Sequence, residues 1–113
     1  MSVNAERALL GALLIDPEAV RLVRPLVTPE DFADRRCRLV YEAILACSDV
    51  DFVLVSCEME ARGTLDEVGT AFLAALCLHT PTSLYAEQYA RAVAEAAQIR
   101  RSAAAADRPG SAV

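Results

Sequence analysis

Apolar residues recur along this chain at the three- and four-residue spacing of amphipathic helices, and polar runs with proline or glycine separate them. The pattern predicts helices over residues 3–15, through Val20 and Val23, over Arg35–Cys47, over 52–62, over Thr70–Leu78 and from about Ser83 to Ala105. Residues 52–55 (FVLV) would also suit a strand, but no second candidate strand exists to pair with them. The chain is therefore predicted to be all-α.

The ends of the early helices carry recognisable signals. Pro25 has no N–H group and should end or kink the second helix. The turn Thr28–Asp31 has the order of a capping box, with Pro29 at the first helical position, and Phe32 after it is a predicted core anchor. The predicted buried face of the next helix, which Tyr41 flanks, consists of Leu39, Val40, Ala43, Ile44 and Cys47.

The last third of the chain contains two helices joined by a short connection with a proline. Thr70–Leu78 is apolar on nearly all sides, which is typical of a helix buried on more than one side. The longer helix after it carries an apolar stripe formed by Tyr85, Tyr89, Val93, Ala96 and Ile99. We expect a compact multi-helix cluster followed by a protruding helical hairpin over residues 69–106, so that 1–106 form one domain and 107–113 a linker-like tail.

Composition narrows the range of functions. A length of 113 residues fits one domain, and 55% hydrophobic residues with only 5% aromatics indicate an aliphatic core. The net charge of −5 argues against general phosphate binding, which depends on clustered basic residues. All 11 basic residues are arginine, and without a lysine the chain cannot build a Walker A site for ATP. No apolar run is long enough for a membrane span and no secretory leader is recognisable, so we expect a cytoplasmic chain without membrane contact.

Catalytic, cofactor-binding and metal-binding constellations are not recognisable in the sequence. The four cysteines occur singly rather than in close pairs, and His79 is the only histidine. Neighbouring acids such as Glu30 and Asp31 stand at helix starts, where carboxylates favour the helix dipole. The one compact basic cluster, formed by Arg35, Arg36 and Arg38, could contact nucleic acid or an acidic partner, although a solvated helix face is the simpler interpretation.

Four stretches, taken in order, match the pattern of a known family. They are AERALLGALLIDPEA (5–19), EDF (30–32) with RLVYEAI (38–44), DFVLVSCEMEARGTLDEVG (51–69) and AFLAALCLHTPTSLYAEQYARAVAEAAQIRR (71–101). Together they resemble the N-terminal domain of the DnaB-type replicative DNA helicase family over about residues 5–101.

The resemblance implies an all-helical domain whose hairpins pair between subunits, build the collar of a hexameric ring and receive primase. It also implies that ATP and magnesium belong to a motor domain absent from these residues, so that this chain is not itself an enzyme and needs no cofactor. The implied partners are a second copy of the chain, further helicase subunits or a loader, and primase, with direct DNA binding weak or absent. The candidate interface residues are Phe72, Leu76, Leu78, Tyr85, Tyr89, Val93, Ala96 and Ile99.

Two other functions remain open on the sequence. The chain could be a stand-alone regulator or decoy that binds a helicase or primase, because the same residues would serve both roles. It could also be a small helical nucleic-acid binder that uses Arg35, Arg36 and Arg38.

Overall fold

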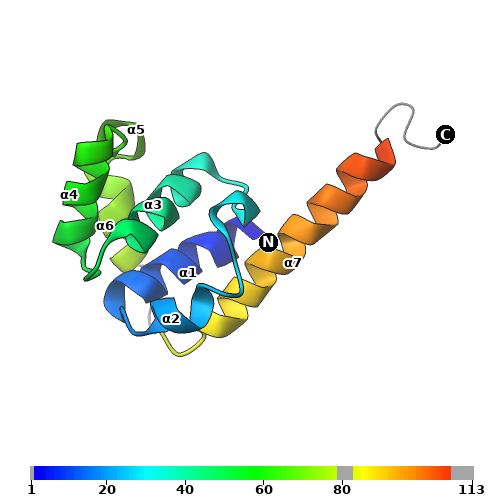
Figure 1. Ribbon diagram of the computed structural model, residues 1–113, viewed down its shortest axis with the longest axis horizontal. Helices are drawn as coiled ribbons and strands as arrows, with labels where there is room; N and C mark the ends of the chain where they lie inside the picture. The colour runs from blue at the N-terminus through cyan, green and yellow to red at the C-terminus, as the bar shows by residue number, and fades with distance from the viewer. Residues whose placement is uncertain (1, 79–82, 108–113) are drawn as a thin grey trace.

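The computed structural model describes residues 2–78 and 83–107, and Figure 1 shows their arrangement. His79, the connection 80–82 and the predicted tail beyond Asp107 lie outside the described residues. The elements are α1 (Ser2–Ile15), α2 (Ala19–Val23), the 3-10 turn η1 (Pro29–Asp31), α3 (Arg35–Ala46), α4 (Phe52–Arg62), α5 (Leu65–Val68), α6 (Thr70–Leu78) and α7 (Ala86–Asp107). Because the described residues form helices and no strand, the predicted all-α class is confirmed, including the helix over 52–62.

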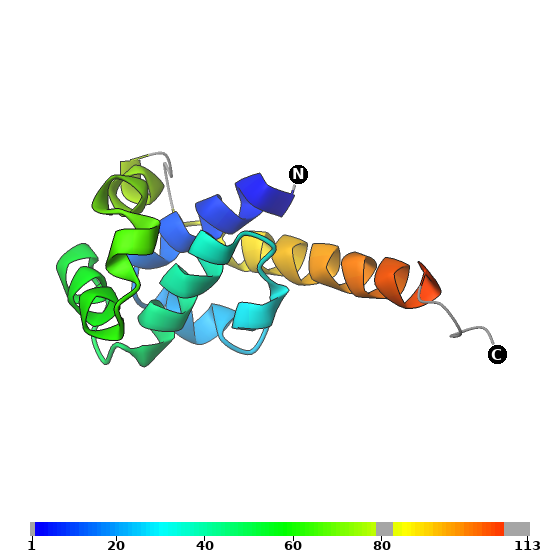
Figure 2. The ribbon, with the colours of Figure 1, turned by 90° about the horizontal axis from the view of Figure 1, so that it is seen from above.

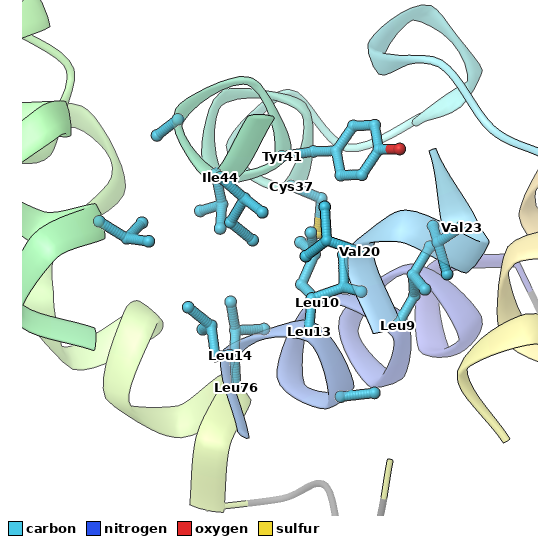
Figure 3. Packing of buried hydrophobic residues seen from close by; sticks show 14 of the residues in the cluster. Leu9, Leu10, Leu13, Leu14, Val20, Val23, Cys37, Tyr41, Ile44 and Leu76 are labelled. Carbon is cyan, nitrogen blue, oxygen red and sulfur yellow. The ribbon is translucent and has the colours of Figure 1, made fainter. Parts of the chain in front are cut away.

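The centre of the fold is α1, which contacts α2, α3, α6 and α7. Its leucines Leu9, Leu10 and Leu13 are fully buried, and Leu14 is nearly so. Figure 3 shows how side chains from α2, α3 and α6 surround them. A helix with apolar residues on several faces has to be covered on several faces, and α2, α3, α6 and α7 pack around α1 for that reason.

The segment between α2 and α3 is fixed to the core by two aromatic rings. Phe32 is fully buried, as predicted, and its ring lies 4.9 Å from that of Tyr41 between centroids. The prediction that Tyr41 flanks the buried face is wrong, because its side chain is fully buried. Burial is tolerated because the hydroxyl donates a hydrogen bond of 2.9 Å to the carbonyl of Val27, which gives the polar end of the ring a partner.

Polar residues and glycine define the ends of α4. Asp51 caps its first turn by accepting a hydrogen bond from the N–H of Leu54 at 2.7 Å. Gly63 ends the helix in the left-handed conformation at φ 76°, where residues with a Cβ are strained. Only Val55 and Met59 of α4 are buried, so α4 covers one end of the cluster and contributes little to its centre.

The predicted hairpin needs a correction, because α6 and α7 hardly touch each other. Each packs against α1 instead, and the two helices diverge from the end where α1 meets α2 (Figure 1). Both carry apolar residues that α1 can bury, which removes the reason for them to pack together. Figure 2 shows that the protruding element is the second half of α7 alone, in a molecule that measures 51 × 31 × 23 Å.

Candidate interaction surface

The buried face of α7 is made mainly of alanine. Ala86, Ala90, Val93 and Ala97 follow one another at helical spacing and are at most 4% exposed. Small side chains let α7 lie close to α1, along which it makes its longest contact. The predicted stripe shares only Val93 with this face, because sequence reasoning gave weight to the large residues Tyr85 and Ile99, which are exposed.

Beyond Ala97, α7 extends past the buried core, although Arg100 and Arg101 still contact η1. Residues 98–105 are exposed on every side of the helix, and Ile99 keeps 63% of its surface in contact with solvent. A shallow groove runs along the first half of α7 and reaches Ile99, and its lining residues are Ala5, Gln88, Arg91, Ala92, Glu95, Ala96 and Ile99. We call this groove, together with the exposed side of α7 at Ile99, the α7 surface.

The candidate interface residues divide into three groups by burial. Leu76 and Val93 are core residues, so the prediction that they face a partner is wrong for the folded chain. Phe72, Tyr89 and Ala96 are half-buried. The side chains that remain exposed are those of Leu78, Tyr85 and Ile99. Of these, Ile99 lies in the α7 surface, whereas Leu78 and Tyr85 stand on either side of the undescribed connection.

Phe72 of α6 is covered by two arginines. The guanidinium of Arg36 lies 4.2 Å from the centre of its ring and that of Arg7 lies 5.3 Å away. Both guanidiniums also approach the carboxylate of Asp34, at 3.7 Å and 3.9 Å. A ring held between two cations joins α6 to α1 and α3, so the part Phe72 plays within the chain is structural.

The predicted basic cluster is not one surface. Arg35 pairs with Glu67 of α5, and this hydrogen-bonded pair raises the pKa of Arg35 and lowers the pKa of Glu67. Arg36 lies over Phe72, whereas Arg38 donates to the carbonyl of Phe32 at 3.2 Å on another side of α3. Arg36 points to a different side of α3 from Arg35 and Arg38, and those two bind different neighbours although they lie one helical turn apart.

Two arginines of α7 hold its exposed half against η1. Arg100 donates to the backbone carbonyl of Asp31 at 2.8 Å, and Arg101 pairs with the Asp31 carboxylate, which also accepts the N–H of Thr28 at 2.9 Å. The capping acid predicted for the turn is therefore present and has a second partner. This contact fixes the direction in which α7 leaves the cluster, and helical periodicity gave no signal for it.

A buried carboxylate supports the same region from the other side. Glu6 of α1 is fully buried and accepts the backbone N–H groups of Ala33 at 2.8 Å and Asp34 at 3.1 Å. It ties the segment between η1 and α3 to the central helix. In the sequence, Glu6 is only a glutamate beside apolar residues in the first helix, and this pattern does not predict that it is buried or which groups it binds.

Three of the four thiols lie in surroundings that keep them protonated. Burial raises the pKa of Cys37 to about 12, and burial also raises the pKa of Cys47 and Cys77. A thiol must lose its proton to act as a nucleophile or a metal ligand. Within residues 2–78 and 83–107, no three His, Cys, Asp or Glu side chains gather closely enough to hold a metal ion. In the same part of the chain, no helix combines the length and apolarity that crossing a bilayer requires.

Comparisons with known proteins agree on one family. Residues 1–95 match the family model described as the DnaB-like helicase N-terminal domain. Among curated proteins, the chain is 36% identical over 105 residues to the replicative DNA helicase DnaB of Geobacillus stearothermophilus and 33% identical over 105 residues to the replicative DNA helicase DnaC of Bacillus subtilis. The match covers 88% of this chain in both cases but only 23% of either relative, so the chain spans about a quarter of their length.

A solved structure supports the same assignment. The crystal structure of the N-terminal domain of DnaB helicase from Mycobacterium tuberculosis superimposes with a TM-score of 0.88 at 34% identity. The superposition covers 92% of this chain and 79% of that one. The resemblance seen in the four sequence stretches therefore extends to the arrangement of the helices.

Proposed function

The chain belongs to the family of DnaB-like helicase N-terminal domains, and we propose that it serves a replicative DNA helicase as a module for self-association and partner docking. In this proposal it helps to assemble helicase subunits into a ring with a collar, and the collar receives primase or a loader in the cytoplasm. The matched residues are those of the N-terminal domain and hold no motor region. The contribution proposed for them is therefore assembly rather than catalysis.

The observation that carries the proposal is the exposure of the second half of α7, and of Ile99 in particular. The helix has 22 residues and a length of about 33 Å at 1.5 Å per residue. Its residues 98–105 are exposed and include Ile99, which lies at a groove lined by three alanines and by Gln88, Arg91 and Glu95. Most of the stability of a protein helix comes from tertiary packing of an apolar face, so an extended helix with an uncovered apolar side is suited to packing against another chain.

Self-association is tested by comparing two substitutions of exposed aliphatic residues. Light scattering and sedimentation of the wild-type chain should show a concentration-dependent dimer or higher species. Ile99→Asp should weaken this association at least about tenfold, because a charge in an apolar contact must be desolvated. Leu54→Asp, at a residue 44% exposed on α4, is the matched control and should leave association unchanged.

Partner docking needs a separate measurement. Calorimetric titration of primase into the chain should give a saturable signal that Ile99→Asp reduces. A wild-type chain that is strictly monomeric at several hundred micromolar would remove self-association from the proposal. An absent signal with primase would remove the docking role and leave self-association untouched.

A further inference from the structure

Arginines that are far apart in the sequence meet at one pocket. Arg38 of α3 and the pair Arg100 and Arg101 of α7 line the same hollow beside η1. Its complete lining consists of Glu30, Phe32, Ala33, Arg38, Ala97, Arg100, Arg101 and Ala104. The pocket brings three guanidinium groups from two helices to one place on the surface.

Two of these three guanidiniums lack a carboxylate partner. In the part of the chain that the structure describes, seven arginines form ion pairs with carboxylates. The three described arginines that form none are Arg24, Arg38 and Arg100, and the last two share this pocket. Every other described arginine is neutralised within the chain, so the pocket concentrates charge that the fold leaves unbalanced.

Backbone contacts hold both unpaired groups in place. Arg38 donates to the carbonyl of Phe32 at 3.2 Å, and Arg100 donates to the carbonyl of the preceding residue, Asp31, at 2.8 Å. The Nε atom of Arg38 is buried without a hydrogen-bond partner. The Asp31 carboxylate is already engaged by Arg101 and by the N–H of Thr28, which leaves Glu30 as the one acid in the lining.

We propose that this pocket binds one oxyanion of the carboxylate or phosphate type. A guanidinium carries five N–H donors, so each arginine that gives one to a carbonyl keeps others for a ligand, and two oxygens of a carboxylate or a phosphate match the spacing of these donors. The ring of Phe32 and the methyl groups of Ala97 and Ala104 supply apolar walls, which suits an oxyanion carried on a small carbon group. The net charge of −5 disfavours a long polyanion such as nucleic acid.

This site does not depend on the proposed function, because it lies on the side of α7 that meets η1 and could be filled with the chain alone in solution. Titration of the isotopically labelled chain with sodium phosphate and with sodium acetate tests it by nuclear magnetic resonance. Sodium chloride at equal ionic strength corrects for screening. The backbone amide signals of Ala33, Arg38 and Arg100 should move along saturable curves, whereas chloride should move them little.

Substitutions separate the pocket from the overall charge of the chain. Arg100→Gln, on the exposed half of α7, should weaken binding at least about tenfold. Arg24→Gln is the matched control, because Arg24 also lacks a carboxylate partner and also donates to a carbonyl, that of Leu45 at 3.4 Å, but lies outside the pocket. Arg38→Gln should act like Arg100→Gln, provided that circular dichroism shows the helices intact.

The ligand series identifies the source of the oxyanion. Tighter binding of a short glutamate-containing peptide than of inorganic phosphate would assign the site to a protein carboxylate, and the reverse order would assign it to a phosphate group. Linear shifts with both ligands, or equal losses for Arg24→Gln and Arg100→Gln, would overturn the proposal. A single-stranded oligonucleotide whose binding falls equally in the two variants would replace it with a diffuse nucleic-acid contact.

Discussion

The first and last helices of this chain are both rich in alanine or leucine, but they serve different purposes. α1 has 14 residues, and its leucines are covered by neighbours on several sides. α7 has 22 residues, yet only a narrow stripe of alanine and valine in its first half is buried, and its second half projects into solvent. The free energy of folding therefore resides mainly around α1, whereas α7 provides surface.

The difference follows from the size of the side chains that meet. Full burial of a leucine stabilises by about 1.5 to 3 kcal/mol, whereas alanine contributes a single methyl group and mainly allows close approach. α1 contributes the buried leucines Leu9, Leu10 and Leu13 to the core. The residues that α7 buries are mostly alanines, namely Ala86, Ala90 and Ala97. Substitution of a buried leucine in α1 should consequently reduce the stability of the whole domain, while substitution of the exposed Ile99 in α7 should change association alone.

The largest expected effect is that of truncating a central leucine. Leu13→Ala should lower the free energy of unfolding by about 2 to 5 kcal/mol, because a fully buried side chain leaves a cavity. Ile99→Ala, at an exposed position in α7, should change it by less than about 0.5 kcal/mol. Urea denaturation followed by circular dichroism measures both at a low protein concentration, where self-association does not contribute. Equal losses in the two variants would show that α7 is as much a part of the core as α1.

The next largest effect should come from the buried carboxylate of α1. Glu6→Ala leaves the N–H groups of Ala33 and Asp34 without their acceptor, which should lower stability by about 2 to 3 kcal/mol. Glu60→Ala, at an exposed acid of α4, is the control and should have little effect. Hydrogen exchange at the amides of Ala33 and Asp34 should become faster in Glu6→Ala. Unchanged exchange there would mean that water can replace the carboxylate.

Periodicity predicted the helices well because each element has a recognisable beginning and end. Gly63 and the prolines Pro17, Pro25 and Pro29 impose backbone restrictions that act locally, so they can be read without a structure. The last helix was expected from Ser83 and begins at Ala86, because Ser83 donates its hydroxyl to Asp16 at 3.1 Å instead. Asp16 lies 67 positions away from Ser83, and a contact between such distant positions does not affect the periodicity of apolar residues from which helices are predicted.

Prediction was weaker for the surface than for the fold. The predicted stripe on α7 includes the large residues Tyr85, Tyr89 and Ile99, because large apolar residues usually face the core, but α1 packs closely against small residues. The basic cluster at Arg35–Arg38 was treated as one unit, although its members point to different neighbours. The pocket that joins Arg38 to Arg100 depends on how α3 and α7 are arranged in space, which neither local sequence contains.

Alkaline pH should weaken the core around α1 by a smaller amount. Burial raises the pKa of Cys37 from its usual 9.0 to about 12 and that of Tyr41 from 10.0 to about 12. As pH rises the unfolded chain therefore loses these protons first, so the stabilisation is complete below pH 9 and declines between about pH 9 and 12. Relative to pH 7, stability should be about 2 kcal/mol lower at pH 10.

The absence of lysine makes this measurement clean, because few groups other than the cysteines and tyrosines titrate in the same range. Urea denaturation at pH 7 to 10.5 under reducing conditions gives the dependence. Cys37→Ala should remove the largest share of the pH dependence, because the pKa of this thiol differs more between the folded and the unfolded chain than the pKa of Tyr41 does. A slope that is the same in Cys37→Ala and in the wild-type chain would mean that the thiol reaches water in the folded state.

The smallest effect compares two tyrosines that differ in burial. Tyr41→Phe removes the hydroxyl that donates to Val27 and leaves a buried carbonyl unpaired, so stability should fall by about 1 kcal/mol. Tyr85→Phe removes a hydroxyl from a residue that is 48% exposed and lies directly before α7. The free energy of unfolding of this variant should stay within about 0.5 kcal/mol of the wild-type value. Because the two substitutions delete the same atom, the difference between them isolates the contribution of burial. If both lowered stability equally, the residues that lead into α7 would belong to the cooperative core, and the division between a stabilising α1 and a projecting α7 would have to be moved beyond Tyr89.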